Sequence, residues 1–221
     1  MAFSHPSGQR HFVAHLTGVG VSLGGRPILR DIDFTLEPGQ VVGVAGPNGS
    51  GKTTLARVFA TLLPIDRGWG SVLRATLGSN ETSEIRTRIG LISHQPALIG
   101  QLTLEENLIH VARLSGIEEG RVRRALEVVG LDAAAERRVD ACSFGMRRRA
   151  EIAHLLLTKP DLLLLDEAAS GLDEPAQLLI DALLDGVRGR GGGAVVVSHD
   201  RRQLEGRCDV VMAIRSGELS V

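Results

Sequence analysis

The chain has 221 residues, of which 43% are hydrophobic, enough to bury a substantial core in one large or two small domains. Its 25 Lys and Arg residues are balanced by 26 Asp and Glu residues, so no broad basic field is present and nucleic acid is not expected as a partner. The two cysteines, Cys142 and Cys208, are too few for a disulfide framework and belong to no metal-binding cluster, which favours a reducing cytosol.

The first predicted elements are two strands near the N-terminus. Residues 11–17 and 31–37 alternate apolar and polar side chains, as strands with one buried face do. The turn-rich residues 23–27 separate them, and residues 37–39 close the second. We therefore predict an antiparallel sheet at the edge of the molecule.

Five short apolar runs predict a second, parallel sheet. Each is too short for a helix and rich in Val, Ile or Leu, and longer amphipathic or polar stretches separate them. This pattern is typical of an α/β fold whose sheet is covered by helices on both faces. The runs are residues 41–45, 89–92, 162–165, 194–197 and 210–214.

A glycine-rich segment follows the first of these strands and precedes the helical stretch of residues 54–63. It reads Gly46-Pro47-Asn48-Gly49-Ser50-Gly51-Lys52-Thr53 and matches the phosphate-binding pattern G-x-x-x-x-G-K-[ST]. The glycines let consecutive backbone N–H groups point at phosphate oxygens, and the helix N-terminus adds partial positive charge. We expect Lys52 to reach the β- and γ-phosphates, Thr53 to coordinate Mg²⁺ and Thr54 to contact phosphate. The alternative is a strand-to-helix turn with an exposed lysine.

The middle third of the chain is predicted to be helical. Residues 104–114 and 121–129 carry apolar side chains at helical spacing, with dense charge on the opposite face. The strand signal is absent between Gln95 and Ser143, so we expect a helical subdomain over about residues 98–158, inserted in a single domain of residues 1–221.

Two acidic residues follow the apolar run of residues 162–165. Ligands gather at the carboxyl ends of strands in open α/β sheets, and Asp166 and Glu167 lie at this position. We expect Asp166 to hold Mg²⁺, and Glu167 to orient or deprotonate the attacking water. The alternative is that both merely cap the following segment.

Taken in order, these motifs and those below resemble the ATP-binding cassette (ABC) family from about residue 16 to the end of the chain. The resemblance implies a P-loop NTPase core of the RecA-like kind, with ATP and Mg²⁺ as cofactors. Gln95 resembles the family's glutamine loop, which senses Mg²⁺ and the attacking water and touches the membrane subunit. Residues 143–147, Ser-Phe-Gly-Met-Arg, occupy the place of the signature Ser-Gly-Gly-Gln, immediately before the helix expected over residues 148–158. Ser143 and Gly145 are therefore expected to clamp a γ-phosphate held by the other subunit.

Two later segments extend the resemblance. Residues Ser170-Gly171-Leu172-Asp173 resemble the loop that crosses the dimer interface. His199 resembles the switch histidine, which bonds the γ-phosphate and holds the glutamate. The remaining histidines of this part of the chain, His94, His110 and His154, are interpreted as ordinary surface or core residues.

The chain departs from the family pattern at several positions. Phe144 and Met146 replace the usual glycine and glutamine of the signature, and Ala168 replaces a common proline. Leu23 stands where relatives place an aromatic residue against adenine, which predicts weaker stacking of the base. The basic residues 147–149 are interpreted as a solvated helix face, with a phosphate clamp as the alternative.

The resemblance implies a function and its partners. Residues 92–98, 102–103, 106–108 and 143–149 look like exporter-type cassettes, with haem or multidrug exporters as the nearest matches. No apolar run approaches the ~20 residues of a membrane-spanning helix, and residues 1–15 lack a signal's apolar core, so a separate membrane permease is expected. The protein would work as a pair of copies at the cytoplasmic face of the cell membrane. Alternatives are a soluble ABC-type ATPase in assembly or repair, and a regulator that only binds nucleotide.

Overall fold

The computed structural model describes residues 11–168 and 172–220, and begins with an antiparallel sheet in the order β2-β1-β4-β5. Its strands are β1 (Ala14–Leu23), β2 (Arg26–Leu36), β4 (Arg67–Val72) and β5 (Ala75–Thr76). The predicted antiparallel edge is confirmed, but β1 and β2 extend further toward each other than the alternation indicates. Gly24 and Gly25 adopt positive φ angles of 57° and 77°, which lets the chain reverse within two residues.

A second sheet of six strands contains the predicted parallel core. Its order is β10-β9-β3-β8-β7-β6, and only β10 runs antiparallel to its neighbour among the described strands. All five predicted runs are strands of this sheet, which confirms the α/β class. They are β3 (Val41–Ala45), β6 (Ile89–Ile92), β7 (Leu162–Asp166), β8 (Gly193–Ser198) and β9 (Val210–Arg215), and β10 (Glu218–Ser220) follows.

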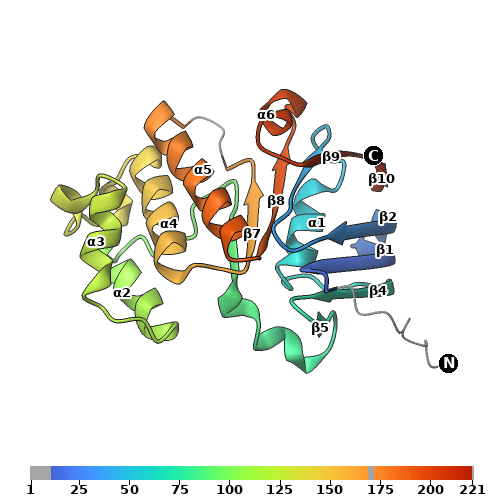
Figure 1. Cartoon of the computed structure of the whole chain (residues 1–221), viewed down its shortest axis with the longest axis horizontal. Coiled ribbons are helices and arrows are strands. Elements are labelled where there is room, and N and C mark those ends of the chain that lie inside the picture. Colours follow the sequence, from blue (N-terminus) through green and yellow to red (C-terminus); the bar gives the residue numbers. More distant parts are fainter. Residues whose placement is uncertain (1–10, 169–171, 221) are drawn as a thin grey trace.

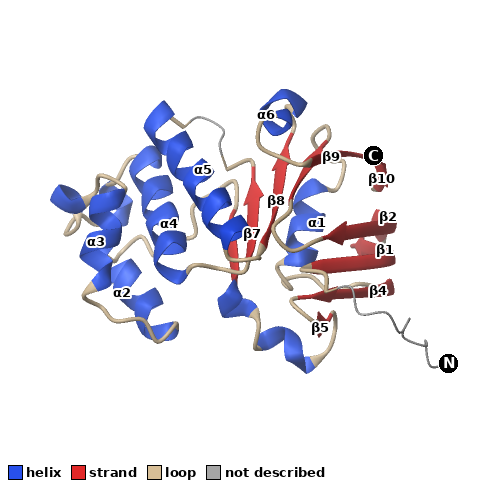
Figure 2. Cartoon of the chain, in the orientation of Figure 1, coloured by secondary structure: helices blue, strands red, loops and turns tan. Residues whose placement is uncertain are grey.

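Helices gather on one side of the molecule and the antiparallel sheet on the other (Figures 1 and 2). The helix α1 (Lys52–Phe59) lies between the two sheets, and α5 (Glu174–Gly189) covers the opposite face of the parallel sheet. Three helices form the far end of the molecule: α2 (Leu104–Leu114), α3 (Arg121–Val128) and α4 (Phe144–Thr158). A short helix, α6 (Arg201–Glu205), follows β8. The proposed boundary of a helical subdomain at about residues 98–158 stays a prediction.

The start of α4 differs from the expected one. The helix begins at Phe144, four residues before Arg148, because Ser143 accepts a hydrogen bond from the Met146 N–H at 3.2 Å and caps the N-terminus. The segment that resembles the signature therefore forms the first turn of a 15-residue helix instead of a loop before it.

The parallel sheet is buried on both faces, and neighbouring residues of one strand enter different cores. Leu162 and Leu164 of β7 pack with α1 and the antiparallel sheet, whereas Leu163 and Leu165 pack with α2 to α5. Burying each such side chain contributes roughly 1.5–3 kcal/mol to folding. Two cores on opposite faces thus hold the strand ends in fixed positions.

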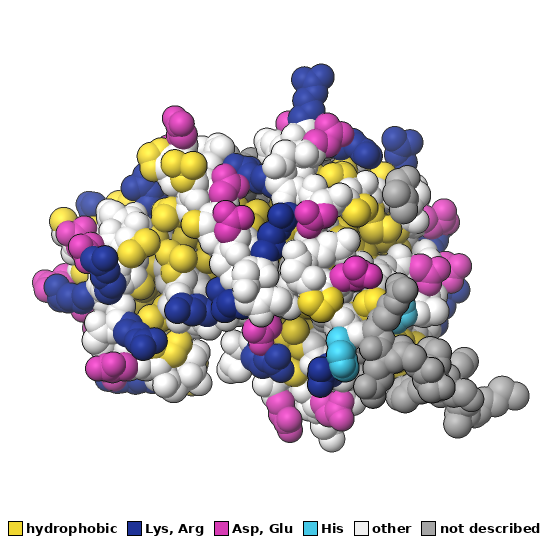
Figure 3. All heavy atoms as spheres, viewed as in Figure 1, with side chains coloured by type: hydrophobic (Ala, Val, Ile, Leu, Met, Phe, Trp, Pro, Cys, Tyr) yellow, Lys and Arg dark blue, Asp and Glu magenta, His cyan; other side chains and the backbone are white. Residues whose placement is uncertain are grey.

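The surface mixes charges of both signs. In Figure 3, Lys and Arg side chains alternate with Asp and Glu side chains across the face shown. Within residues 11–168 and 172–220, none of the helices has both the length and the apolar character needed to cross a bilayer.

Candidate nucleotide-binding site

The turn between β3 and α1 has the backbone geometry expected of a phosphate-binding loop. Gly49 and Gly51 have positive φ angles of 78° and 108°, a conformation that side chains with a Cβ atom rarely adopt. A Cβ atom on Gly51 would also lie 2.9 Å from the Leu29 side chain. The turn therefore delivers the chain directly into α1, whose first N–H groups have no partner within the helix.

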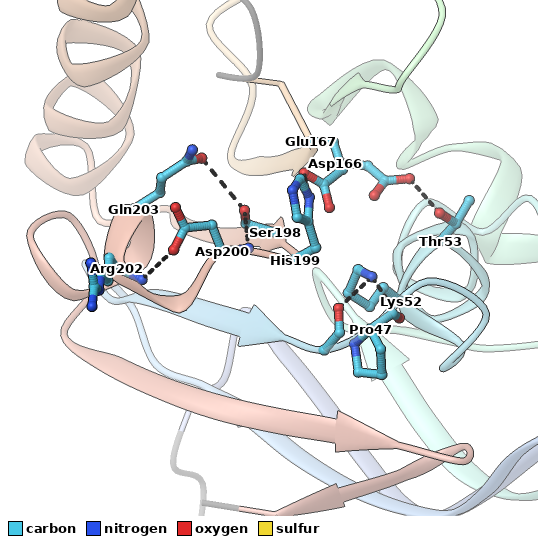
Figure 4. A network of polar contacts seen from close by, with 11 residues as sticks. Pro47, Lys52, Thr53, Asp166, Glu167, Ser198, His199, Asp200, Arg202 and Gln203 are labelled. Carbon is cyan, nitrogen blue, oxygen red and sulfur yellow. Dashed lines mark hydrogen bonds and ion pairs between the residues drawn. The ribbon is translucent and has the colours of Figure 1, made fainter.

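Lys52 is the first residue of α1, and its side chain turns back over the loop. Its Nζ donates hydrogen bonds to Gly46 O at 2.7 Å and to Pro47 O at 2.9 Å, as Figure 4 shows. The residue is 6% exposed. An ammonium has three donors, so this buried cation retains one donor for an anion beside the loop.

The next residue links the loop to the end of β7. Thr53 Oγ1 donates a hydrogen bond to Asp166 Oδ2 at 2.8 Å, and Asp166 is 2% exposed. The second carboxylate oxygen, Oδ1, is buried and has no hydrogen-bond partner in the part of the chain described. A hydroxyl and a partly unsatisfied carboxylate side by side are hard oxygen ligands that fit Mg²⁺.

Glu167 and His199 face each other at the ends of β7 and β8. His199 Nδ1 lies 2.9 Å from Glu167 Oε2, a hydrogen-bond distance (Figure 4). Glu167 has a positive φ angle of 54°, and its N–H donates to Val197 O at 3.0 Å. An energetically unfavourable backbone is thus held by the neighbouring strand and directs the carboxylate toward the histidine.

These groups border one cavity of about 600 Å³ at the carboxyl edge of the parallel sheet. The adjacency of β3, β8 and β7 brings the loop after β3 together with the residues that end the other two strands. The lining residues are Ile28, Asn48, Gly49, Gly51, Lys52, Thr53, Thr54, His94, Asp166, Glu167 and His199. A site with a cation, backbone donors and two carboxylates can bind a polyphosphate and a divalent metal.

Several residues predicted for the site do not line the cavity. Gly46 and Ser50 belong to the loop, but neither is among the described residues that line the cavity. Gln95, Ser143 and Gly145 are also absent from that lining, and all three are exposed. The cavity of one chain is therefore assembled without the segment that resembles the signature. Ser170 and Gly171 lie outside the described residues.

Two lining residues were not predicted. His94, interpreted from sequence as an ordinary surface or core residue, is exposed and also lines the cavity. The sequence signal that could have identified it is its position two residues after the predicted strand of residues 89–92. Ile28 supplies an apolar wall, whereas Leu23 is 41% exposed and does not line the cavity in the part of the chain described.

The interpretation of residues 147–149 as a solvated helix face is wrong at Arg148. Arg148 is 1% exposed and pairs with Glu151 at 2.8 Å. Burial lowers the pKa of Arg148 and raises the pKa of Glu151. Arg149 pairs with Asp173, which also caps α5 by accepting from the Ala176 N–H at 3.2 Å. Arg148 differs from an exposed arginine because carbonyl groups of a facing segment accept its hydrogen bonds. The linear sequence does not show which segment lies opposite.

The chain is similar in sequence to one protein family and to several known proteins. A family model described as ABC transporter matches residues 29–170. The chain is 34% identical over 206 residues to the Nod factor export ATP-binding protein I of Bradyrhizobium diazoefficiens, covering 91% of this chain and 67% of that protein. It is 32% identical over 200 residues to the linearmycin resistance ATP-binding protein LnrL of Bacillus subtilis, covering 89% and 64% respectively. The chain thus spans about two thirds of the length of these relatives.

Solved structures agree in fold. An ATP-binding subunit of an ABC transporter superposes with a TM-score of 0.86 at 25% identity, covering 94% of this chain and 88% of that one. A dimeric post-hydrolysis state of the ATP-binding cassette MJ0796, bound to ADP and Pi, superposes with a TM-score of 0.80 at 26% identity, covering 93% and 96%. The α/β architecture with two sheets and a helical end is shared with these cassettes.

Proposed function

This chain belongs to the ABC transporter family, and on that premise we propose that it is the ATP-binding and hydrolysing subunit of an exporter. ATP hydrolysis in this subunit drives substrate through a separate membrane permease. The observation that carries the proposal is the single cavity in which Lys52, Asp166, Glu167 and His199 converge.

The loop of residues 46–51 and the start of α1 bind the phosphates. Backbone N–H groups and the positive end of the helix attract the anion, and Lys52 is fixed by two loop carbonyls so that its remaining donor reaches the β- and γ-phosphates. Thr54 contributes a further hydroxyl from the cavity wall. These residues hold ATP in one orientation before any bond breaks.

Thr53 and Asp166 hold Mg²⁺. The hydroxyl and the unpartnered Oδ1 atom would provide oxygen ligands, and the side chain of Gln95 would be a further one. The bound metal supplies positive charge that offsets the charge developing on the phosphate oxygens.

Glu167 orients the attacking water and accepts its proton, while His199 fixes the carboxylate. Phosphoryl transfer depends mainly on positioning and charge, so a glutamate held at 2.9 Å from an imidazole is a suitable group for this step. In the ABC family the switch histidine also contacts the γ-phosphate, and we assign the same contact to His199.

A second copy of the chain supplies Ser143 and Gly145. Ser143 is exposed at the N-terminus of α4, where hydroxyl, N–H groups and helix dipole meet, yet it lies outside the cavity of its own chain. Two copies that face each other enclose two ATP molecules, and hydrolysis separates them. The assembly sits at the cytoplasmic face of a membrane through its permease.

The cargo is selected by the permease. The named relatives concern export of Nod factor and resistance to linearmycin, which supports export of an organic molecule by this transporter. Haem or a drug-like molecule remains the prediction for the cargo class.

Phosphate release by the purified chain with ATP and Mg²⁺ tests the proposal directly. Glu167→Gln is expected to abolish turnover and to trap an ATP-dependent dimer in sedimentation velocity. A parent chain that binds ATP without hydrolysing it, alone or with its permease, would instead be a nucleotide-binding regulator. Co-purification of a hydrophobic partner from detergent-solubilised membranes distinguishes a transporter subunit from a soluble ATPase.

A further inference from the structure

The loop after β6 is held at both ends by side chains of α4. Arg148 Nη1 donates to Ser93 O at 2.7 Å, and Arg148 Nη2 donates to His94 O at 3.1 Å. At the other end, the Ala97 N–H donates to Glu151 Oε1 at 2.8 Å. Two carbonyl groups and one N–H group of this loop are thus hydrogen-bonded to two side chains of one helix.

The two side chains also contact each other and are covered. Arg148 Nη1 donates to Glu151 Oε2 at 2.8 Å, and their side chains are 1% and 7% exposed. The ring of Phe144 lies over the guanidinium group, with its centroid 5.3 Å from the guanidinium carbon. Gln95 lies between the two ends of the loop that this pair fixes. We call Arg148 and Glu151 the buried pair.

Stability is a poor explanation for the buried pair. Taking two charges out of water offsets most of their attraction, and apolar replacements of buried ion pairs are often neutral or stabilising. Arg148 Nε is, in addition, buried without a hydrogen-bond partner among the described residues. An apolar pair would hold α4 against its neighbours equally well, but it could not bind the carbonyls and the N–H group of the loop.

The buried pair connects two functional positions. His94 lines the nucleotide cavity, and its carbonyl oxygen accepts from Arg148. Ser143 caps the same helix on which Arg148 lies, and the helix is continuous between the two positions. These hydrogen bonds give a displacement of the loop beside the nucleotide a direct path to the helix tip that Ser143 occupies.

We propose that Arg148 and Glu151 are positioning residues that join the loop of residues 93–97 to the start of α4. Occupancy of the cavity in one copy then sets the position of its own Ser143, which faces the nucleotide of the second copy. This inference rests on the proposed function, because it gives the helix tip a role in a dimer. It adds that each copy reports the state of its own site to its twin through this pair.

The test replaces both charges at once, with Arg148→Met/Glu151→Leu, so that no unpaired charge is left buried. The expected result is nucleotide affinity of the monomer within about threefold of the parent, measured with a fluorescent ATP analogue, because the cavity keeps its phosphate-binding residues. The kcat for ATP is expected to fall by about tenfold or more, and the ATP-dependent dimer of the Glu167→Gln background to weaken by a similar factor.

Two further variants keep the test decisive. Arg148→Lys retains the charge but cannot reach three acceptors, so its kcat is expected to lie between those of the parent and the double variant, even if the double variant does not fold. Arg124→Met/Glu127→Leu removes an ion pair of the same spacing from the exposed face of α3 and is expected to change neither kcat nor dimerisation by more than about twofold.

The outcomes separate the two proposals. Parent-like kcat and dimerisation in both Arg148→Lys and the double variant would overturn the inference while leaving the proposed function intact. A parent that neither hydrolyses ATP nor dimerises would overturn the proposed function, and hydrogen exchange then decides the inference. Slower exchange of residues 145–151 on adding ATP to the parent, lost in the double variant or in Arg148→Lys, supports it, and equal slowing in parent and variants contradicts it.

Discussion

Two regions of the molecule are held in place by different kinds of contact. The cavity region consists of the carboxyl ends of β3, β7 and β8 with the loop of residues 46–51, and its positions follow from backbone pairing inside two apolar cores. The helical region consists of α2, α3 and α4, and its contact with the loops beside the cavity depends on buried polar side chains. Asn107, Arg148 and Glu151 are examples.

We infer from this difference that the residues that carry out the chemistry are distinct from the residues that position the helical region. Side chains at the strand ends contribute little to the cores, so changing them should alter catalysis and leave folding intact. None of Asn107, Arg148 and Glu151 lines the cavity, and Arg148 reaches the cavity wall only through the His94 carbonyl, so changing these residues should alter stability or coupling. The predictions below test this division, beginning with the largest effect.

Asp166→Asn is expected to reduce ATP hydrolysis by about a thousandfold, roughly 4 kcal/mol of transition-state stabilisation. The free energy of unfolding without nucleotide should stay equal or rise, because a buried negative charge is removed from a carboxylate that is only partly hydrogen-bonded. Phosphate release and urea unfolding measure the two effects. Asp161→Asn is the control at the opposite end of β7, where the carboxylate forms an exposed ion pair with Arg88. A loss of activity matched by a loss of stability in Asp166→Asn would contradict the division.

His199→Ala is expected to lower kcat by about a hundredfold and to change KM much less, because the imidazole acts through Glu167. Steady-state kinetics over a range of ATP concentrations measure both parameters. His110→Ala, on the exposed face of α2, serves as the control and should leave both within about twofold. An equal rise in KM with unchanged kcat would show that the histidine only binds nucleotide.

Asn107→Ala is expected to destabilise the fold by about 2–3 kcal/mol. The side chain accepts from Ile99 N at 2.8 Å and donates to Ile99 O at 3.1 Å and Thr103 O at 2.8 Å. The substitution leaves the Ile99 N–H without its acceptor, and each of the two carbonyls loses one of its two donors. Urea unfolding measures the change, and Asn80→Ala at an exposed position should lie within about 0.5 kcal/mol of the parent. Monomer affinity for ATP should be retained, and its loss would mean that the helical region shapes the cavity.

The sequence was informative where one strand or loop determines the geometry. Runs such as residues 41–45 and 162–165 identify strands because both of their faces are buried, and the glycines of residues 46–51 identify the loop between them. The helices of residues 104–114 and 121–128 follow equally from their spacing. Roles of individual site residues remain predictions, although the structure brings Lys52, Asp166 and their neighbours to one cavity.

Elements and contacts that depend on distant partners were missed. The strand β4 contains two glycines and little alternation, and it forms because β1 offers it a paired edge. Arg148 looks like its neighbours in sequence, and only the carbonyls of Ser93 and His94, more than fifty residues away, make its burial possible. Sequence periodicity reports the face of an element, whereas these features are set by which element lies opposite.

The smallest expected effect is on the pH dependence of stability, and it concerns a histidine of the helical region, His154. His199 is 57% exposed in its side chain beside Glu167, whereas His154 lies on α4, where burial lowers its pKa below the usual 6.5. The folded state therefore binds fewer protons at His154 than the unfolded state does, so its contribution to stability is complete above that value and is lost as pH falls through it. We expect the free energy of unfolding to decrease from about pH 7.5 to about pH 5.5, and His154→Gln to flatten that slope. Identical slopes in the parent and His154→Gln would show that α4 opens to solvent around His154, and the helical region would then be held more loosely than its buried polar contacts indicate.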